Sequence, residues 1–458
     1  MTTRWTKRLA ATAALAFAVA ACSSAEEAPD TTEAPPGTEA PGTTEAPPTT
    51  EAPAPTEPPA EAPGGVNCDE PVKVGLVTDL TGTLAIYGSM VDATVPLGLE
   101  YATGAPGTDG KYMLDNCEIE LIVKDDQSTP ETTGTVAREL VEVDGADILI
   151  GTVNSGATAT LQEVAADNEI PLIVAPAASS EITGANFNEH TFRTSRQSYQ
   201  DAITLCEFFA KEHETFVVIA QDYSFGQAGA AALTDACTQQ GAKAAADTIL
   251  VPMDVQEFTP YMDEVLDTGA EAWMLVWAGP TFIPLFQAAA DSGVLDSMAL
   301  GAQFIDNGTQ PAIYGEAVGQ TGAILYHYGL LDNPINDWMV DKAEEMGAGF
   351  PDLFWADGMN AGIAVVEALR LTGGDVSADA LIGALEGLVF EGPKGTIEFR
   401  AEDHVAIQDM YVVTLDNVDD EAFLFYTLQE TVRPEPPCQL PDDLVERCGD
   451  LAVGSLSG

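Results

Sequence analysis

Basic side chains are scarce in this sequence. Only 17 Lys+Arg stand against 73 Asp+Glu, so the chain carries a formal net charge of −56 at pH 7. A surface of that sign repels phosphate backbones, which excludes nucleic acid as a partner. Three of the basic residues, Arg4, Lys7 and Arg8, lie in an N-terminal leader without acids, so its removal would make the mature protein more negative still.

Recognisable catalytic motifs are also missing. The four histidines, His190, His213, His327 and His404, are scattered without the spacing of metal ligands. There is no Gly-x-Ser-x-Gly nucleophile turn, and segment 392–396 lacks the spacing of a phosphate-binding Walker loop. Although a site can be assembled from distant residues, we expect a protein that is not an enzyme and that uses no metal and no cofactor.

Long apolar runs are limited to the leader. The run 9–21 follows Arg4, Lys7 and Arg8, is too short to span a bilayer, and ends in Val-Ala-Ala-Cys-Ser-Ser at 19–24. This ending is typical of a bacterial lipobox. We predict a signal peptide at 1–21 and a lipid on Cys22 that anchors the protein to the extracytoplasmic face of the cell membrane. The alternative is an ordinary signal peptide with an incidental cysteine.

Large apolar side chains are almost absent from 22–67. This segment consists mainly of Pro, Thr, Glu and Ala, and Thr-Glu-Ala-Pro recurs at Thr32, Thr38, Thr44 and Thr50. Such a composition cannot bury enough surface to offset chain entropy. We predict a disordered linker that holds the folded portion away from the membrane.

Six cysteines remain once Cys22 is set aside, and none forms a Cys-x-x-Cys pair. In an exported chain an even set of this kind indicates disulfides. Six cysteines allow fifteen pairings. We predict the pairing of sequence neighbours: Cys68 with Cys117, Cys206 with Cys237, and Cys438 with Cys448.

From Pro71 onward, short β-branched runs alternate with amphipathic or Ala-rich segments, which indicates parallel sheets covered by helices. The predicted strands are 72–78, 118–124, 148–153, 172–174, 216–220, 244–250 and 273–276. The predicted helices between and after them are 131–143, 157–168, 199–213, 227–240 and 282–292. Later come helices 336–346, 355–372 and 378–388, the last capped by Ser377, and strands 395–399, 409–415 and 423–428.

Two such α/β sets, on either side of about Thr194, predict two Rossmann-like lobes. The last third interrupts the alternation, so we expect the chain to return to both lobes. The expected boundaries are 68–193 for lobe 1, 194–322 for lobe 2, 323–400 for the return to lobe 1, 401–432 for the return to lobe 2, and 433–458 for a tail with a disulfide loop.

Small hydroxyl residues follow two of the predicted strands. Strand 148–153 is followed by Asn-Ser-Gly-Ala-Thr at 154–158, and strand 172–174 by Pro-Ala-Ala-Ser-Ser at 176–180. Ligands of parallel α/β sheets bind beyond the carboxyl ends of the strands. Both loops could therefore offer N–H groups and a hydroxyl to one anion, such as a carboxylate. The alternative is that Ser155 and Ser179 only cap helices.

Several of these segments, in their order along the chain, resemble the Leu/Ile/Val-binding type of periplasmic solute-binding protein that serves ABC importers. The resemblance covers about 71–428. Its motifs are 72–75, 80–82, 84–88, 125–130, 150–151 with 155–157, 170–171 with 175–179, 192–194, 222–226, 392–395, and 403–404 leading to 411–413. It implies an α/β type I periplasmic-binding-protein fold whose two lobes are joined by a three-crossing hinge and close on the ligand.

The resemblance also implies a ligand site. Ser155, Ala177 and Ser179 match positions that hold the α-carboxylate and α-ammonium of an amino acid. Tyr87 and Phe225 match aromatic positions, and Trp277 lies in the strand-end loop that supplies another aromatic. For these three aromatics the alternative is plain core packing.

Two departures from the family pattern bear on specificity. Gln303 stands where the family places the acid for the ligand ammonium, and a neutral amide holds a cation less well than an acid does. Asp306, or Asp357 near the hinge, would then take that role. Phe225 also lacks the hydroxyl of the tyrosine that is common at its position.

These observations predict a lipid-anchored receptor of an ABC importer that binds an amino acid, branched-chain or otherwise aliphatic. The expected partners are the small-molecule ligand, the permease subunits, and the membrane through the lipid, and we expect a monomer. The alternatives are the same fold tuned to urea, a short amide or another small organic acid, a sensor without an importer, and an exported hydrolase.

Overall fold

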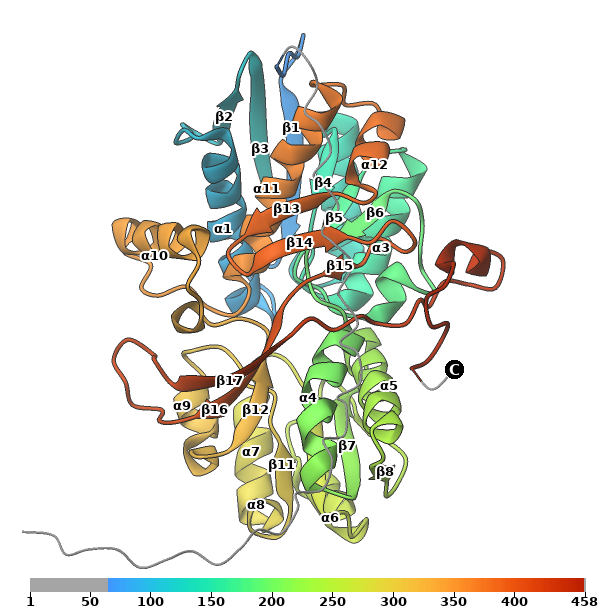
Figure 1. The fold of residues 1–458 in the computed structure, drawn as a ribbon, viewed down its shortest axis with the longest axis vertical. Helices are drawn as coiled ribbons and strands as arrows, with labels where there is room; N and C mark the ends of the chain where they lie inside the picture. The colour runs from blue at the N-terminus through green and yellow to red at the C-terminus, as the bar shows by residue number, and fades with distance from the viewer. Residues whose placement is uncertain (1–64, 457–458) are drawn as a thin grey trace, which may run out of the picture. The chain divides into compact units, whose positions relative to one another are not determined.

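A computed structural model of the chain describes residues 65–456. The predicted signal peptide, the lipid on Cys22 and all but the end of the predicted linker lie outside these residues. The described part contains two α/β lobes (Figure 1), as predicted. No helix in it has both the length and the apolar character needed to cross a membrane.

Lobe 1 is built on a six-stranded sheet in the order β2-β3-β1-β4-β5-β6. The strands are parallel except β2, which runs antiparallel to β3. Nearly every residue of β1 is buried, as is typical of a parallel strand covered on both faces. The bounds are β1 (Val72–Thr78), β2 (Lys111–Leu114), β3 (Cys117–Asp125), β4 (Ile148–Ile150), β5 (Leu172–Val174) and β6 (Thr191–Arg193).

Helices cover both faces of this sheet, and each face has its own apolar core. One face is covered by α1 (Ala85–Thr103) and α11 (Trp355–Thr372), the other by α2 (Pro130–Arg138), a π-helical segment η1 (Glu139–Asp144) and α3 (Ser155–Asp167). Helices α1 and α11 meet at glycines, since a Cβ on Gly98 would lie 2.1 Å from the carbonyl oxygen of Met359. Further elements are η2 (Ser180–Thr183), α10 (Pro334–Met346), α12 (Ala378–Leu385) and the sheet β13 (Val389–Gly392), β14 (Gly395–Phe399) and β15 (Ala406–Ile407).

Lobe 2 has a parallel sheet in the order β11-β10-β7, with β8 and β9 both on the far edge of β7. Helices α4 and α5 cover one face, and α6 and α7 the other. The bounds are β7 (Thr215–Gln221), β8 (Lys243–Ala244), β9 (Ile249–Val251), β10 (Ala272–Val276), β11 (Ala299–Gly301), α4 (Ser198–Glu212), α5 (Ser224–Gln239), α6 (Thr259–Asp267), α7 (Phe282–Asp291), α8 (Val294–Ser297), α9 (Gln310–Ile313) and η3 (Gly315–Ala317).

Four predictions of local structure were wrong in detail. The strand predicted at 244–250 is two short strands, β8 and β9, because 245–248 leaves the sheet between them. The strand predicted at 148–153 ends at Ile150, and the strand predicted at 423–428 is β17, which begins at Tyr426. Ser377 precedes α12 as predicted, but its side chain makes no capping hydrogen bond.

The chain passes between the lobes three times, after β6, after β12 (Thr321–Ile324) and after β15. Strand β12 pairs with β16 (Met410–Leu415), which pairs with β17 (Tyr426–Val432), so the second and third passages lie a few residues later than 323 and 401. The passages are tied together: Thr194 Oγ1 donates to the carbonyl of Asp357 at 3.0 Å, and Gln408 Nε2 donates to the carbonyl of Thr194 at 3.0 Å.

The three disulfides confirm the predicted pairing: Cys68–Cys117, Cys206–Cys237 and Cys438–Cys448. The last closes a loop in the C-terminal tail, which also holds the short helix η5 (Val445–Cys448). A remaining short helix, η4 (Tyr328–Leu330), follows β12.

Candidate ligand-binding site

A cavity of about 90 Å³ lies between the carboxyl ends of the strands of both lobes. Lobe 1 contributes residues that follow β1, β4 and β5, and lobe 2 contributes residues that follow β7, β10 and β11. This is where parallel α/β sheets place their ligands. One buried water takes roughly 10–15 Å³ of such volume, so the cavity has room for on the order of six to nine water-sized groups.

The two loops singled out by the sequence meet at this cavity. Asn154 caps α3, because its Oδ1 accepts from the N–H groups of Gly156 and Ala157 at 2.9 and 3.1 Å. Ser155, the next residue, is therefore not the cap; it lines the cavity together with Ala177. Gly151 allows the approach, since its φ is +137° and a Cβ there would lie 2.0 Å from the carbonyl oxygen of Val77.

Hydrogen-bond donors remain open on this wall. The hydroxyl of Ser155 accepts from the N–H of Ser179 at 3.2 Å and donates to no acceptor in the described part of the chain. The backbone N–H groups of Ser155 and Ala178 likewise find no acceptor among residues 65–456. The wall therefore has two N–H groups and one O–H that are free to donate to a ligand.

Ser179 lies behind the wall. It is fully buried and does not line the cavity. Its Oγ accepts from the N–H of Glu181 at 3.3 Å and so caps η2, while its own N–H holds the Ser155 hydroxyl. Ser179 is therefore a helix cap, which is the alternative given above for this residue. It holds the Ser155 hydroxyl in place and does not contact the cavity.

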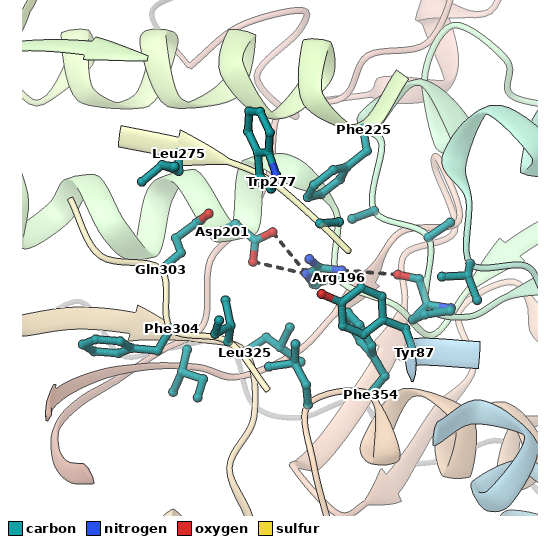
Figure 2. Close-up of a pocket in the computed structure, with 18 of the residues that line it drawn as sticks. Tyr87, Arg196, Asp201, Phe225, Leu275, Trp277, Gln303, Phe304, Leu325 and Phe354 are labelled. Atoms are coloured by element: carbon teal, nitrogen blue, oxygen red, sulfur yellow. Dashed lines mark hydrogen bonds and ion pairs between the residues drawn. The ribbon is translucent and has the colours of Figure 1, made fainter. Parts of the chain in front are cut away.

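Aromatic side chains form a large part of the remaining wall, together with aliphatic ones. Eight line the cavity, and Figure 2 shows Trp277 and Phe225 on the lobe 2 side. Trp277 Nε1 donates to Thr281 Oγ1 at 3.1 Å, which fixes the indole against the cavity. Phe225 also packs on the α4–α5 core, so for this residue core packing and cavity lining are both present. Burial raises the pKa of Tyr223, another lining residue, so its hydroxyl stays neutral.

Tyr87 joins the two lobes across the cavity. Its ring lies edge-on to Phe354 with 5.2 Å between centroids, and its hydroxyl accepts from the N–H of Gly279 in lobe 2 at 3.3 Å. Burial, reinforced by the charge of Asp306, raises its pKa, so the hydroxyl is neutral at any ordinary pH. A second link joins Ser224 Oγ of lobe 2 to Glu181 of lobe 1 at 2.7 Å. Because these two hydrogen bonds join the lobes, the structure has the lobes closed on the cavity.

The three candidates for the ligand ammonium are placed differently. Gln303 lines the cavity. Asp306 does not, and its Oδ1 accepts from the N–H of Thr309 at 2.8 Å. Asp357 is fully buried at the hinge and also does not line the cavity, and neither of its carboxylate oxygens has a hydrogen-bond partner among the described residues. Burial raises the pKa of Asp357 to about 6, against the opposing effect of Lys394.

Two charged residues that the sequence did not single out line the cavity instead. Arg196 follows β6 in the first hinge passage, and Asp201 lies in the first turn of α4. Arg196 Nε donates to the two carboxylate oxygens of Asp201 at 3.3 and 3.1 Å (Figure 2). The one sequence signal for Arg196 is its position two residues after the family motif at 192–194. Asp201 is one of 73 acids and carries no such signal.

One acidic cluster has the geometry to attract a metal ion. Asp79, Asp125 and Asp126 bring one carboxylate oxygen each within 4.8 Å of one another. These carboxylates already accept hydrogen bonds from the loop after β1 and from Ser128, Thr133 and Thr152. The cluster therefore holds strand-end loops in place. The buried histidines are structural as well, since His404 bonds the Thr191 carbonyl and Glu386.

Comparisons with known proteins agree with this architecture. The family model "Periplasmic binding protein" matches residues 71–421. The chain is 24% identical over 367 residues to the Leu/Ile/Val-binding protein homolog 6 of Brucella melitensis, covering 77% of this chain and 89% of that protein.

Solved structures give the same fold. The crystal structure of an ABC-type branched-chain amino acid transporter from Rhodopseudomonas palustris is 33% identical, with a TM-score of 0.65, and the match covers 79% of this chain and 96% of that one. A solute-binding protein of an ABC transporter from R. palustris, in complex with 4-hydroxybenzoate, is 18% identical with a TM-score of 0.70, covering 80% and 98%. The chain therefore belongs to the periplasmic binding protein family, in its type I form, and is a substrate-binding protein of an ABC transporter related to binders of branched-chain amino acids.

Proposed function

We propose that this protein is the lipid-anchored, extracytoplasmic receptor of an ABC importer, and that its lobes close by hinge motion on a small carboxylate-bearing solute, an amino acid with an apolar side chain. One observation carries the proposal: a small cavity between the lobes combines open donors at Ser155 and Ala178 with the guanidinium of Arg196 and an apolar, aromatic wall. Such a cavity suits a ligand with one charged end and one apolar end.

The size and the binding energy are consistent with this ligand class. A leucine-sized molecule has about nine heavy atoms, and micromolar affinity needs roughly 8 kcal/mol, below the ceiling of about 1.5 kcal/mol per atom for small ligands. Closure would exclude water, so the hydrogen bonds to the carboxylate would act at low dielectric. Closure would also create the ligand-dependent surface that a permease recognises.

A second candidate ligand is an aromatic carboxylate. The aromatic wall favours it, and a neighbour of the same fold is described in complex with 4-hydroxybenzoate. Urea and short amides suit the site less well, because they carry no charge for Arg196 or Asp201 to recognise. Permease and ATPase genes beside this one would favour import over sensing.

The test is a ligand panel. Apolar amino acids, benzoates and short amides are added to the purified protein, and thermal unfolding and calorimetry report binding. A ligand at a hundred times its dissociation constant stabilises the fold by roughly 2.7 kcal/mol. Amino acids or benzoates should stabilise the protein and be recovered unchanged after prolonged incubation. Turnover of any panel member, or the absence of any stabilisation, would overturn the proposal.

A matched pair of serines localises the carboxylate. Ser155→Ala removes a hydroxyl that lines the cavity, whereas Ser179→Ala removes one that lies behind it. We expect Ser155→Ala to weaken carboxylate ligands by roughly tenfold, the worth of a hydrogen bond to a charged group. Ser179→Ala should weaken them less and lower the melting temperature more, because it uncaps η2. The reverse order would move the carboxylate away from the α3 loop.

The anchor is tested separately in cells. Wild-type protein should sediment with membranes, and Cys22→Ser should release it or leave it uncleaved. If Cys22→Ser is cleaved normally and still sediments with membranes, the prediction of a lipid anchor on Cys22 is wrong.

A further inference from the structure

Within the cavity wall, formal charge is confined to two side chains, Arg196 and Asp201. We propose that they act as one recognition pair, in which Arg196 binds the carboxylate and Asp201 binds the ammonium of the same ligand, so that the receptor selects zwitterions over plain carboxylates. The inference rests on the proposed function, since it concerns the same site. It assigns to Asp201 the role that the sequence gave to Gln303, Asp306 or Asp357.

Arg196 is held firmly but keeps donors for a ligand. Its Nε donates to Asp201, its Nη1 donates to the carbonyl of Pro176 at 3.3 Å, and its guanidinium carbon lies 5.4 Å from the centroid of the Phe354 ring. A guanidinium has five N–H donors. Both N–H groups of Nη2 find no acceptor in the described part of the chain, although the residue is 7% exposed. Because Arg196 lines the cavity, these two donors are available to a bound carboxylate, which accepts bidentate hydrogen bonds from a guanidinium.

Asp201 keeps acceptor capacity in the same way. Both of its oxygens share the single Nε–H of Arg196, whereas a carboxylate can accept about four hydrogen bonds. No other donor to this carboxylate is found among residues 65–456. Its position in the first turn of α4 also favours a negative charge. Gln303 lines the same cavity, and its amide oxygen is a further acceptor for a ligand ammonium.

The charge balance decides between ligand classes. The pair itself is neutral, so a bound zwitterion leaves the closed cavity neutral, with each charge beside an opposite one. A plain carboxylate would leave the enclosed site with one negative charge in excess, next to Asp201, and buried unpaired charge is strongly disfavoured. The apolar wall contributes equally to both. We therefore expect the amino acid to bind at least about 100-fold more tightly than its analogue without the amine.

The experiment uses ligands that differ by one group. Leucine is compared with 4-methylpentanoate, which lacks the amine, and with 3-methylbutylamine, which lacks the carboxylate; phenylalanine, 3-phenylpropanoate and phenethylamine form the aromatic set. Calorimetry gives each dissociation constant for the wild type and for Asp201→Asn, which keeps the shape of the side chain. Glu118→Gln is the control, because it removes an acid from an exposed ion pair with Lys111 on lobe 1.

Asp201→Asn should change the two classes in opposite directions. Loss of the acid removes the partner of the ammonium, so the amino acid should bind at least about tenfold more weakly; the plain carboxylate should bind more tightly, because Arg196 is then uncompensated. Arg196→Gln should weaken both amino acid and carboxylate and leave the amine least affected. Melting temperatures of the ligand-free variants show whether each has folded, and Asp201→Asn decides the question alone if Arg196→Gln does not fold.

Two results would overturn the inference and leave the proposed function standing. One is a wild-type protein that binds 4-methylpentanoate or 3-phenylpropanoate as tightly as the amino acid. The other is an Asp201→Asn variant that changes both classes by the same factor, as a purely structural role would. If no amino acid or carboxylate binds to the wild type at all, the proposed function fails together with the inference.

Discussion

The hydroxyl of Tyr87 offers a direct measure of how much the closed arrangement contributes to affinity. It accepts a hydrogen bond from the N–H of Gly279 across the cavity at 3.3 Å, and it is the one polar atom of a side chain that otherwise packs against Phe354. Tyr87→Phe removes this link and keeps the ring. A neutral hydrogen bond contributes about 0.5–1.5 kcal/mol. Ligand affinity should therefore fall by roughly 2- to 10-fold, because in the proposed hinge motion only the closed form binds tightly.

The loss of affinity in Tyr87→Phe should come from faster dissociation of the ligand. In the hinge motion proposed above, a ligand first meets an open form in which Tyr87 and Gly279 are apart. We therefore expect the association rate to change little and the dissociation rate to rise by the full factor. The matched control is Tyr101→Phe on the same helix, whose hydroxyl makes no hydrogen bond within the described residues. Since burial raises the pKa of Tyr87, the ratio between variant and wild type should be constant from pH 6 to 9.

Stopped-flow fluorescence and calorimetry can measure these quantities with a panel ligand. The reasoning fails if Tyr87→Phe leaves the dissociation rate unchanged, or if Tyr101→Phe raises it equally. It also fails if the loss appears in the association rate alone, since the hydrogen bond would then act before closure.

Two further predictions concern stability. Burial lowers the pKa of His327 to about 4, against the opposing bond to the Phe423 carbonyl, so the unfolded chain takes up the proton first. The difference in free energy of unfolding between the wild type and His327→Gln should be constant above about pH 6.5. It should shift against the wild type by about 3 kcal/mol between there and pH 4. Denaturant titrations that give the same difference at both pH values would contradict this. A Cβ on Gly88 would lie 1.8 Å from the carbonyl oxygen of Asp79, whereas Gly383 in α12 faces open space. Gly88→Ala should therefore lower the melting temperature severely. Gly383→Ala should raise it slightly, because alanine favours the helix by about 1 kcal/mol over glycine.

The fold was predictable because its signals are local and repeated. Strands buried on both faces appear as continuous apolar runs, and Val72–Thr78 was predicted with its observed bounds. Segment 244–250 was predicted as one strand because it has the right composition. The four residues 245–248 stand opposite only Val217 and Val218 of β7, so they cannot all pair with it, and this mismatch is not visible in the sequence. The disulfides followed from pairing each cysteine with its neighbour along the sequence.

The residues that line the cavity were predictable only where the topology of the backbone places them there. The loops after β4 and β5 must meet because parallel strands share one carboxyl edge, and this brought Ser155 and Ala177 together. The side chain that caps α3 was missed, although Asn154 stands beside Ser155 and asparagine is as good a cap as serine. Arg196 and Asp201 come from a hinge passage and the helix after it, and no periodic pattern indicates which side chains there turn toward a cavity.

The acidity of the chain and the charge of the cavity make a joint prediction about the ligand. A net charge of −56 repels an approaching carboxylate at long range, whereas an amino acid carries no net charge at neutral pH. Salt shortens the reach of this repulsion from about 8 Å at physiological ionic strength to about 3 Å at 1 M. The association rate of a plain carboxylate should therefore rise with added salt, while that of leucine should change by less than about twofold. Equal salt dependence for both ligands would mean that the surface charge does not act on ligand entry, and selection between them would then depend on Arg196 and Asp201 alone.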